Sequence, residues 1–189
     1  MSVRKLGAFI QVSLDGYFAD PNGDLSFAHK DPGDAEWNAF VEGNAKGGGA
    51  LIFGRITYEM MASYWPTPMA AKQNPAVAER MNAMPKIVFS LRLDEVSWAN
   101  TTLVKGDPVA EMRKLKDAAG PDMTILGSGS IVARLLEHKL IDGLQIVVCP
   151  LVLGHGKRLF DGVNRRLDLT LTGTRAFGNG SVLLCYAPA

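Results

Sequence analysis

The stretch Thr124-Ile125-Leu126-Gly127-Ser128-Gly129-Ser130-Ile131-Val132-Ala133-Arg134-Leu135-Leu136 decides the fold class of this chain. An apolar run ends in Gly-Ser-Gly-Ser and passes directly into a helical apolar pattern, which predicts a strand, a tight turn and a helix start. A helix N-terminus presents unpaired N–H groups and a positive dipole end, so it can hold a phosphate. The Rossmann fingerprint needs a third glycine where Val132 stands. The turn therefore predicts a nucleotide-phosphate site outside the usual dinucleotide fold, and a plain strand–helix connection is the alternative.

Length and composition indicate one globular domain over residues 1–189, with 47% hydrophobic and 21% charged residues. The net charge of +1 and the lack of a Lys/Arg-rich run argue against nucleic-acid binding. Cys149 and Cys185 lie in apolar runs, which favours two small buried side chains. The three histidines stand at spacings that fit no metal motif, so no metal site is predicted.

The first residues, Met1-Ser2-Val3-Arg4-Lys5-Leu6, contain no signal-peptide core and lead into a strand pattern. No run approaches the ~20 apolar residues of a membrane span. We therefore expect a cytoplasmic protein without a membrane partner.

Strands and helices alternate over the first two-thirds of the chain, which predicts parallel pairing. Expected strands are 3–14, 50–53, 85–90, 101–104 and 123–126, and expected helices begin at 34, 54, 76 and 107. The segment 66–75 contains three prolines and is expected to be a loop. Strands without helices between them are expected at 143–149, 167–177 and 181–186, and we expect them to be antiparallel. The predicted fold is an α/β three-layer sandwich with a mixed, mainly parallel sheet and C-terminal antiparallel strands.

Three polar segments directly follow expected parallel strands: Gly54-Arg55-Ile56-Thr57, Ser90-Leu91-Arg92 and Gly127-Ser128-Gly129-Ser130. Ligands of open α/β sheets bind outside the carboxyl ends of parallel strands. Each segment supplies groups that suit a phosphate. Their agreement in position predicts one binding site at this edge of the sheet.

Five segments together resemble a known family: Ser13–Tyr17, Gly54–Glu59, Val88–Arg92, Leu126–Ser130 and Pro150–Phe160. Their order and spacing are similar to the dihydrofolate-reductase-like family that includes the reductase domain of bacterial riboflavin biosynthesis. The resemblance covers roughly residues 3–187, and we do not expect a zinc deaminase domain with it. It implies a dihydrofolate-reductase-like fold, NADPH as hydride donor, a small-molecule substrate and often a homodimer.

The resemblance also implies the cofactor-binding residues. Arg55 suits the 2′-phosphate of NADPH, because a guanidinium matches phosphate oxygens in a bidentate way. Dihydrofolate reductases carry a cis peptide in a Gly-Gly pair at the later turn. Here the pair is Gly127-Ser128, and a cis bond before a residue other than proline costs ~3–4 kcal/mol. The implied cofactor residues are Gly54, Arg55 and Thr57 for the phosphates, Ser90 and Arg92 for the adenosine 2′-phosphate or ribose, and Gly127, Ser128, Gly129, Ser130 and Ile131 for the pyrophosphate and nicotinamide ribose.

Acidic residues near the predicted cleft each have two interpretations. Asp15 is the candidate catalytic residue, because it could orient the substrate or assist proton transfer, and an Asp-Gly turn with Gly16 is the alternative. Gly16 is expected in the cleft wall. Asp34 or Glu36 could pair with the N–H groups of a heterocycle, whereas a helix N-cap and a first-turn acid explain both residues without a substrate.

Aromatic and basic residues supply the remaining candidates. Tyr17, Trp37 and Trp65 could stack on a flat substrate ring, and core or rim packing is the alternative. His155, with Lys157 and Arg158, could bind an anionic substrate group, and a solvated basic loop is the alternative.

The sequence thus predicts an NADPH-dependent reductase of a small, heterocyclic substrate, with water or Asp15 as proton donor. One alternative is the riboflavin-pathway activity, 5-amino-6-(5-phosphoribosylamino)uracil reductase, acting on a ribosylamino-pyrimidine phosphate. Another is a non-catalytic module that binds a nucleotide or a drug.

Overall fold

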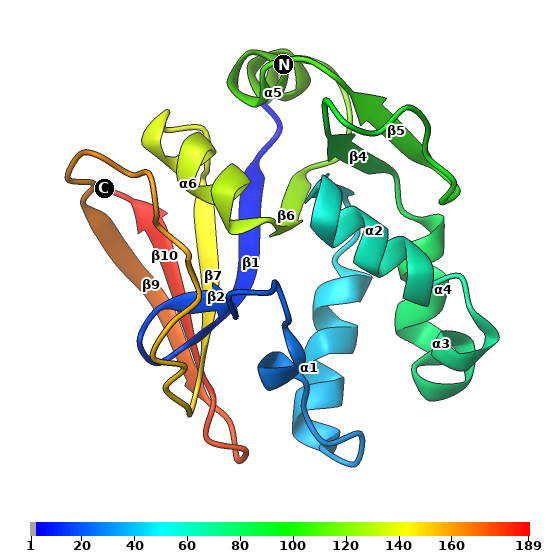
Figure 1. Ribbon diagram of the computed structural model, residues 1–189, viewed down its shortest axis with the longest axis vertical. Coiled ribbons are helices and arrows are strands. Elements are labelled where there is room, and N and C mark those ends of the chain that lie inside the picture. The colour runs from blue at the N-terminus through cyan, green and yellow to red at the C-terminus, as the bar shows by residue number, and fades with distance from the viewer. Residues whose placement is uncertain (1–2) are drawn as a thin grey trace.

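An eight-stranded sheet forms the centre of the computed structural model, which describes residues 3–189 (Figure 1). Its order is β5-β4-β3-β6-β1-β7-β10-β9. Neighbours from β5 to β7 are parallel, and β10 is antiparallel to both β7 and β9. The strands are β1 (Leu6–Ser13), β3 (Ala50–Gly54), β4 (Lys86–Phe89), β5 (Thr101–Val104), β6 (Met123–Gly127), β7 (Gly143–Cys149), β9 (Leu169–Ala176) and β10 (Val182–Pro188). The predicted α/β fold with a mixed, mainly parallel sheet is confirmed.

The strand at residues 143–149 pairs in two ways. β7 is antiparallel to β10, as expected, but it also runs parallel to β1 on its other side, with Gly7 opposite Gly143 and Ser13 opposite Cys149. The physical reason is the helix α6 (Gly129–Glu137), which carries the chain back along the sheet after β6. A strand–helix–strand unit of this kind gives parallel strands.

Helices cover both faces of the sheet, as the alternation of buried side chains along β1 requires. Even-numbered β1 residues such as Leu6 and Ile10 pack with α5 (Pro108–Asp117) and α6. Odd-numbered Phe9 packs instead with Trp37 and Phe40 of α1 (Ala35–Lys46). The remaining helices are α2 (Arg55–Tyr64), α3 (Pro68–Gln73), α4 (Pro75–Ala83) and the short η1 (Ser26–Ala28).

Helix starts follow the local signals in the sequence. Asp34 caps α1 by accepting a hydrogen bond from the Trp37 amide, and Asp107 caps α5 by accepting one from the Ala110 amide. The expected loop at 66–75 is wrong, because α3 occupies most of it. Thr67 accepts from the Ala70 amide and Pro68 stands at the first helical position, so a cap followed by proline starts this helix.

A small second sheet lies beside the large one. It pairs β2 (Tyr17–Ala19) with β8 (Lys157–Arg158) in antiparallel fashion. Sequence patterning did not predict it, since both strands are too short for a period. The pairing brings the loop after β1 against the loop after β7.

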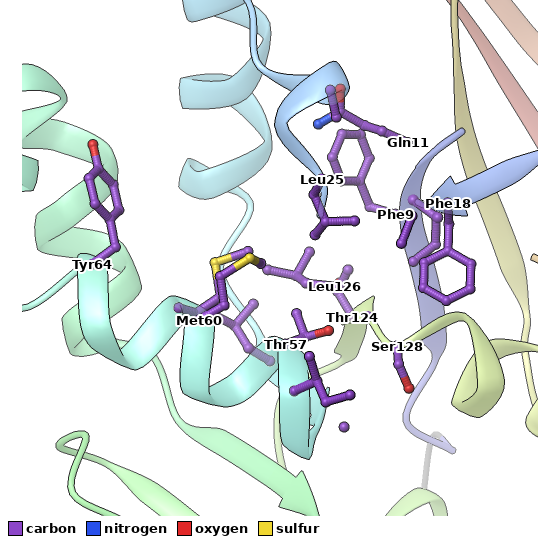
Figure 2. A pocket seen from close by; sticks show the side chains of 18 of the residues that line it. Phe9, Gln11, Phe18, Leu25, Thr57, Met60, Tyr64, Thr124, Leu126 and Ser128 are labelled. Atoms are coloured by element: carbon purple, nitrogen blue, oxygen red, sulfur yellow. The ribbon is translucent and has the colours of Figure 1, made fainter. Parts of the chain in front are cut away.

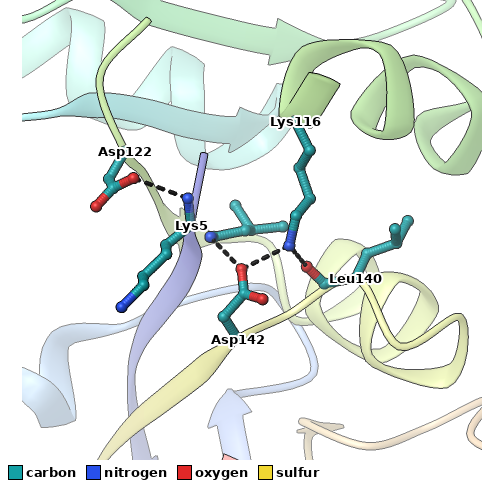
Figure 3. A network of polar contacts seen from close by, with 6 residues as sticks. Lys5, Lys116, Asp122, Leu140 and Asp142 are labelled. Atoms are coloured by element: carbon teal, nitrogen blue, oxygen red, sulfur yellow. Dashed lines mark hydrogen bonds and ion pairs between the residues drawn. The ribbon is translucent and has the colours of Figure 1, made fainter. Parts of the chain in front are cut away.

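A polar network ties together the chain ends of several elements at the amino-terminal edge of the sheet (Figure 3). The Asp142 carboxylate accepts from the Leu6 amide at 2.6 Å and from Lys116 Nζ at 2.5 Å. Lys116 also donates to the Leu140 carbonyl at 2.9 Å, and the Lys5 amide donates to Asp122. The network fixes β1 against α5 and β7 at the edge away from the predicted site.

No helix among residues 3–189 combines the length and the apolar character that crossing a membrane requires.

Candidate functional site

A cleft of about 2120 Å³ lies on the α1 side of the sheet, over the carboxyl ends of β1, β3 and β6. Figure 2 shows Thr57 and Ser128 at one end and Gln11 at the other, with apolar side chains between them. The cleft brings together most of the predicted site residues: Tyr17, Gly54, Arg55, Thr57, Trp65, Ser90, Arg92, Gly127, Ser128, Ser130 and Ile131. Asp15, Gly16, Asp34 and Gly129 do not line it.

The turn between β6 and α6 approaches α2 very closely. Gly127 has φ of +140°, and the Gly127–Ser128 peptide is cis. A Cβ on Gly127 would lie 2.6 Å from Thr57 Oγ1, so only glycine fits this position without a shift of its neighbour. The sequence left it undecided whether the Gly127–Ser128 peptide is cis, and the structure shows that it is.

The N-termini of α2 and α6 meet at the same place. A Cβ on Gly54 would lie 2.7 Å from Ser128 Oγ, and the Ser128 and Ser130 hydroxyl oxygens are 2.8 Å apart. Within residues 3–189, no side chain caps either helix. The first amides of both helices therefore have no intrahelical acceptor and present their N–H groups at one end of the cleft.

Two arginines lie near this end of the cleft, one with an ion-pair partner among residues 3–189 and one without. Arg55 forms an ion pair with Glu59 at 2.8 Å, one helical turn further along α2. Arg92 is exposed and forms no ion pair with any carboxylate of residues 3–189. Ser90 accepts hydrogen bonds from the Arg92 and Leu93 amides, so it shapes the turn that carries Arg92.

Phe18 covers the start of α6. A Cβ on Gly129 would lie 2.4 Å from Phe18 Cε1, so the ring packs directly on the Gly129 backbone. Gly129 is buried for this reason and does not line the cleft. Figure 2 shows the Phe18 ring beside Ser128.

Asp15 holds a loop. Its carboxylate accepts from the Leu153 amide at 3.1 Å and from the Gly154 amide at 2.8 Å. Hydrogen bonds from the Ser13 hydroxyl and these amides lower the pKa of Asp15 to about 2. The Gly16 amide donates to the Ser13 carbonyl, and Gly16 has φ of +85°, as an Asp-Gly turn requires. The geometry thus favours the turn interpretation over a catalytic one.

Asp34 and Glu36 face the β9–β10 hairpin. Asp34 caps α1 and accepts from Asn179 Nδ2 at 2.7 Å. Glu36 accepts from the Gly178 amide and from Arg175, each at 2.9 Å. These hydrogen bonds, with the Trp37 amide as the largest contributor for Asp34 and the Gly178 amide for Glu36, lower both pKa values. Neither carboxylate lines the cleft, so the N-cap and first-turn interpretation fits the geometry.

The aromatic candidates line the cleft and also make packing contacts with neighbouring side chains. Tyr17 is buried, its hydroxyl accepts from Arg158 at 3.2 Å, and the guanidinium lies 5.2 Å from its ring centre. Trp65 lines the cleft and donates its indole N–H to Met61 Sδ. Trp37 lines the cleft too but packs edge-on against Phe177. His155, Lys157 and Arg158 line the cleft on its loop side.

Sequence reasoning missed several residues of the cleft, among them Phe9, Gln11 and Lys30. Gln11 carried a usable signal, because it shares the odd-numbered face of β1 with Phe9. Lys30 lies in a loop and carried none. Lys30 adds to the positive charge of the site: among residues 3–189, Asp161 is the one acidic residue that lines the cleft, against Lys30, Arg55, Arg92, Lys157 and Arg158.

Metal ligands are not gathered anywhere in the described part of the chain: residues 3–189 contain no group of three or more His, Cys, Asp or Glu side chains that could hold an ion.

Comparison with known proteins gives the family and the fold of this chain. A family model described as the RibD C-terminal domain matches residues 4–183. The uncharacterized protein YyaP of Bacillus subtilis (strain 168) is 26% identical over 183 residues, covering 97% of this chain and 94% of its own. A putative riboflavin biosynthesis protein from Shewanella sp. PV-4 superposes with a TM-score of 0.76 at 24% identity, covering 98% of this chain and 99% of that one.

The dihydrofolate reductase from Enterococcus faecalis, solved in complex with NADP(H), shares the fold as well. Its TM-score is 0.63 at 15% identity, and the match covers 97% of this chain and 96% of the reductase. The two structural matches show that a dihydrofolate-reductase-like fold carries the cleft.

Proposed function

Since this chain belongs to the RibD C-terminal domain family, we propose that it is a reductase that uses NADPH to reduce a small, heterocyclic substrate in the cleft. One observation carries the proposal: the N-termini of α2 and α6 meet at Gly54 and Ser128, at the carboxyl ends of two parallel strands. Amides, hydroxyls and two arginines are thereby gathered at one end of the cleft, next to its apolar middle.

The residues at this end suit a dinucleotide. Gly54 and Gly127 let the two turns approach each other closely, where a side chain would collide with Ser128 or Thr57. The unpaired amides of two helix starts attract anionic oxygens. The E. faecalis reductase of the same fold was solved with NADP(H), which supports the choice of cofactor.

In this proposal the phosphates lie at Gly54, Thr57 and the 127–131 turn. Arg55 and Arg92 bind the 2′-phosphate that distinguishes NADPH from NADH, because guanidinium groups match phosphate oxygens. Ser90 holds the turn of Arg92 in place.

A reduced nicotinamide supplies a hydride when bound. The chain contributes position: Phe9, Leu126 and Met60 line the middle of the cleft and present apolar surface to the reacting rings (Figure 2). Asp15 is a poor proton donor, because its pKa of about 2 keeps it ionised at neutral pH and its oxygens bind the Leu153–Gly154 loop. We therefore propose that water supplies the proton.

The riboflavin-pathway activity is a second candidate, favoured by the basic residues on the loop side of the cleft. Lys157 and Arg158 line the cleft in β8 and could face a substrate phosphate. Oxidation of NADPH with 5-amino-6-(5-phosphoribosylamino)uracil as the partner, at a rate typical of an enzyme and reduced in Lys157→Ala, would establish this activity. The homodimer implied by the family resemblance stays a prediction.

The proposed function is tested by titrating NADPH and NADH into the wild type, Arg55→Ala, Arg92→Ala and Arg113→Ala by calorimetry. Arg113 lies exposed on α5 outside the cleft and is the matched control. We expect preference for NADPH, a loss of about tenfold in Arg55→Ala or Arg92→Ala because a charge-assisted hydrogen bond is removed, and no change in Arg113→Ala. Failure of both nucleotides to bind would refute the proposal, whereas binding without turnover of any candidate would favour a non-catalytic module.

A further inference from the structure

The end of the cleft opposite the helix N-termini contains a second polar group of residues. Figure 2 shows Gln11 there, beyond Phe9 and Leu25, at a distance from Thr57 and Ser128. Lys30 also lines the cleft, on the loop that follows η1. The function proposed above gives neither residue a role.

Lys30 has an ammonium group without a strong acceptor. Its Nζ lies 3.2 Å from Cys149 Sγ and 5.5 Å from the ring centre of Trp37. A thiol is a weak acceptor, and an ammonium carries three donors. Lys30 forms no ion pair among residues 3–189: the charge of Lys30 acts on Asp34, but the Asp34 oxygens are bonded to the Trp37 amide and Asn179.

Gln11 faces the same sulfur. Its carbonyl oxygen Oε1 lies 4.0 Å from Cys149 Sγ, and within the described chain its amide nitrogen donates to no acceptor. Gln11 and Lys30 therefore bring free N–H donors, one of them charged, to one place beside the buried Cys149. Cys149 and Trp37, which contact these donors, are both buried, so the donors lie against a part of the cleft wall that is shielded from solvent.

The carboxylates that could bind a cationic ring are turned elsewhere. Asp34 and Glu36, the two candidates on α1, hold the β9–β10 hairpin. Of the described residues that line the cleft, Asp161 alone is acidic. A protonated heterocycle would thus meet positive charge, whereas an anionic oxygen would meet donors.

We infer that Lys30 and Gln11 bind an anionic oxygen, such as a carboxylate, at one end of a flat apolar ligand whose body lies between Phe9, Leu25, Leu126 and Met60. That this ligand is the compound being reduced rests on the proposed function. The preference of this end of the cleft for an anion does not rest on the proposed function, because Lys30 and Gln11 lie outside the proposed dinucleotide site.

The test compares two flat bicyclic probes of equal size and opposite charge, 2-naphthoate and 2-naphthamidine. Their affinities are measured by calorimetry, with and without NADPH, for the wild type, Lys30→Met, Gln11→Leu and Lys30→Arg. Lys46→Met is the matched control, because it removes the same charge from an exposed position of α1 outside the cleft. Thermal unfolding of each variant checks that the fold is retained.

We expect the wild type to bind 2-naphthoate at least about tenfold more tightly than 2-naphthamidine. The Lys30 ammonium donates a charged hydrogen bond to the carboxylate of 2-naphthoate and repels the positive amidine of 2-naphthamidine. Lys30→Met should abolish this preference, Gln11→Leu should weaken it, and Lys30→Arg and Lys46→Met should keep it.

Three outcomes would overturn the inference: equal or reversed preference, no binding of either probe at millimolar concentration, or loss of 2-naphthoate binding in Lys157→Met while Lys30→Met retains it. If NADPH fails to bind but the probe series behaves as expected, the reductase proposal fails and the polarity of the cleft stands. If NADPH binds and the probes show no preference, the inference about Lys30 and Gln11 fails and the reductase proposal stands.

Discussion

Gly127 and Thr57 pack so closely that a Cβ on Gly127 would lie 2.6 Å from the Thr57 hydroxyl oxygen. This contact joins the turn before α6 to the first turn of α2, and it sets the separation of the two helix N-termini. The geometry of the proposed phosphate site thus depends on a position where no side chain fits.

Gly127→Ala is expected to destabilise the protein by more than ~1 kcal/mol, because alanine is strained at a φ of +140° and also collides with Thr57. Urea unfolding measures the change. Gly43→Ala is the control: Gly43 lies within α1 with open space around its Cα, and alanine should stabilise the helix by ~0.5–1 kcal/mol. Equal unfolding midpoints for Gly127→Ala and the wild type would contradict the close contact.

Glu59→Gln is expected to tighten NADPH binding about two- to fivefold, the range set by a partly exposed ion pair. The Glu59 carboxylate lies 2.8 Å from Arg55 and competes with a phosphate for the same guanidinium. The measurement is a titration of NADPH and NADH, with the gain confined to NADPH.

Glu111→Gln removes a similar ion pair, to Lys114 on α5, and should leave both affinities unchanged. Weaker binding in Glu59→Gln would mean that the carboxylate orients Arg55 instead of competing for it.

The stability contributed by Asp15 should disappear in acid. Folding lowers the pKa of its carboxyl from 3.8 to about 2, chiefly through the Ser13 hydroxyl. The contribution is therefore fully present above pH 3.8 and is lost as the pH falls through 2.

Melting temperatures of the wild type and Asp15→Asn, measured from pH 7 to pH 2, check this expectation. Asp15→Asn should melt lower at pH 7, and the difference should shrink below pH 4. A difference that stays constant down to pH 2 would show that the ionised carboxylate does not hold the Leu153–Gly154 loop.

Asp142→Ala is expected to cost ~1–3 kcal/mol of unfolding free energy. It leaves the Leu6 amide without its acceptor, and it removes the carboxylate that pairs with the largely buried Lys116 ammonium, which keeps its hydrogen bond to the Leu140 carbonyl. Chemical denaturation measures it. Asp168→Ala is a suitable comparison, since its side chain pairs with Arg166 and both groups are exposed. That pair should contribute less than ~1 kcal/mol. Similar losses in both variants would indicate that the network of Figure 3 has no special weight.

The helix caps and most of the strands could be predicted because their signals are local. Asp34 and Asp107 cap helices through hydrogen bonds to amides three residues away. The α3 helix was missed although Thr67-Pro68 is a start signal, because three prolines in ten residues obscured it. The parallel partner of β7 depends on where α6 delivers the chain, which local periodicity does not record.

The site divides in the same way. Residues 54–57 and 127–131 follow apolar strands and could be found from the order of the sequence alone. Asp15 and Asp34 were assigned two interpretations each, and the choice depended on Gly154 and Asn179, residues far away along the chain. Lys30 acquires its meaning from Cys149, 119 positions later, so no pattern in the sequence could point to it.

The central place of β1 in the sheet has a consequence for how the chain folds. Its pairing partners are distant: Lys5 bonds to Asp122, 117 positions away, and Leu6 bonds to Asp142, 136 positions away. The middle of the sheet therefore cannot form until long loops close, and the entropy of closure precedes any gain from burial. We expect folding to be slow for the protein's size, with β1 remaining unprotected against amide exchange until β6 and β7 are in place.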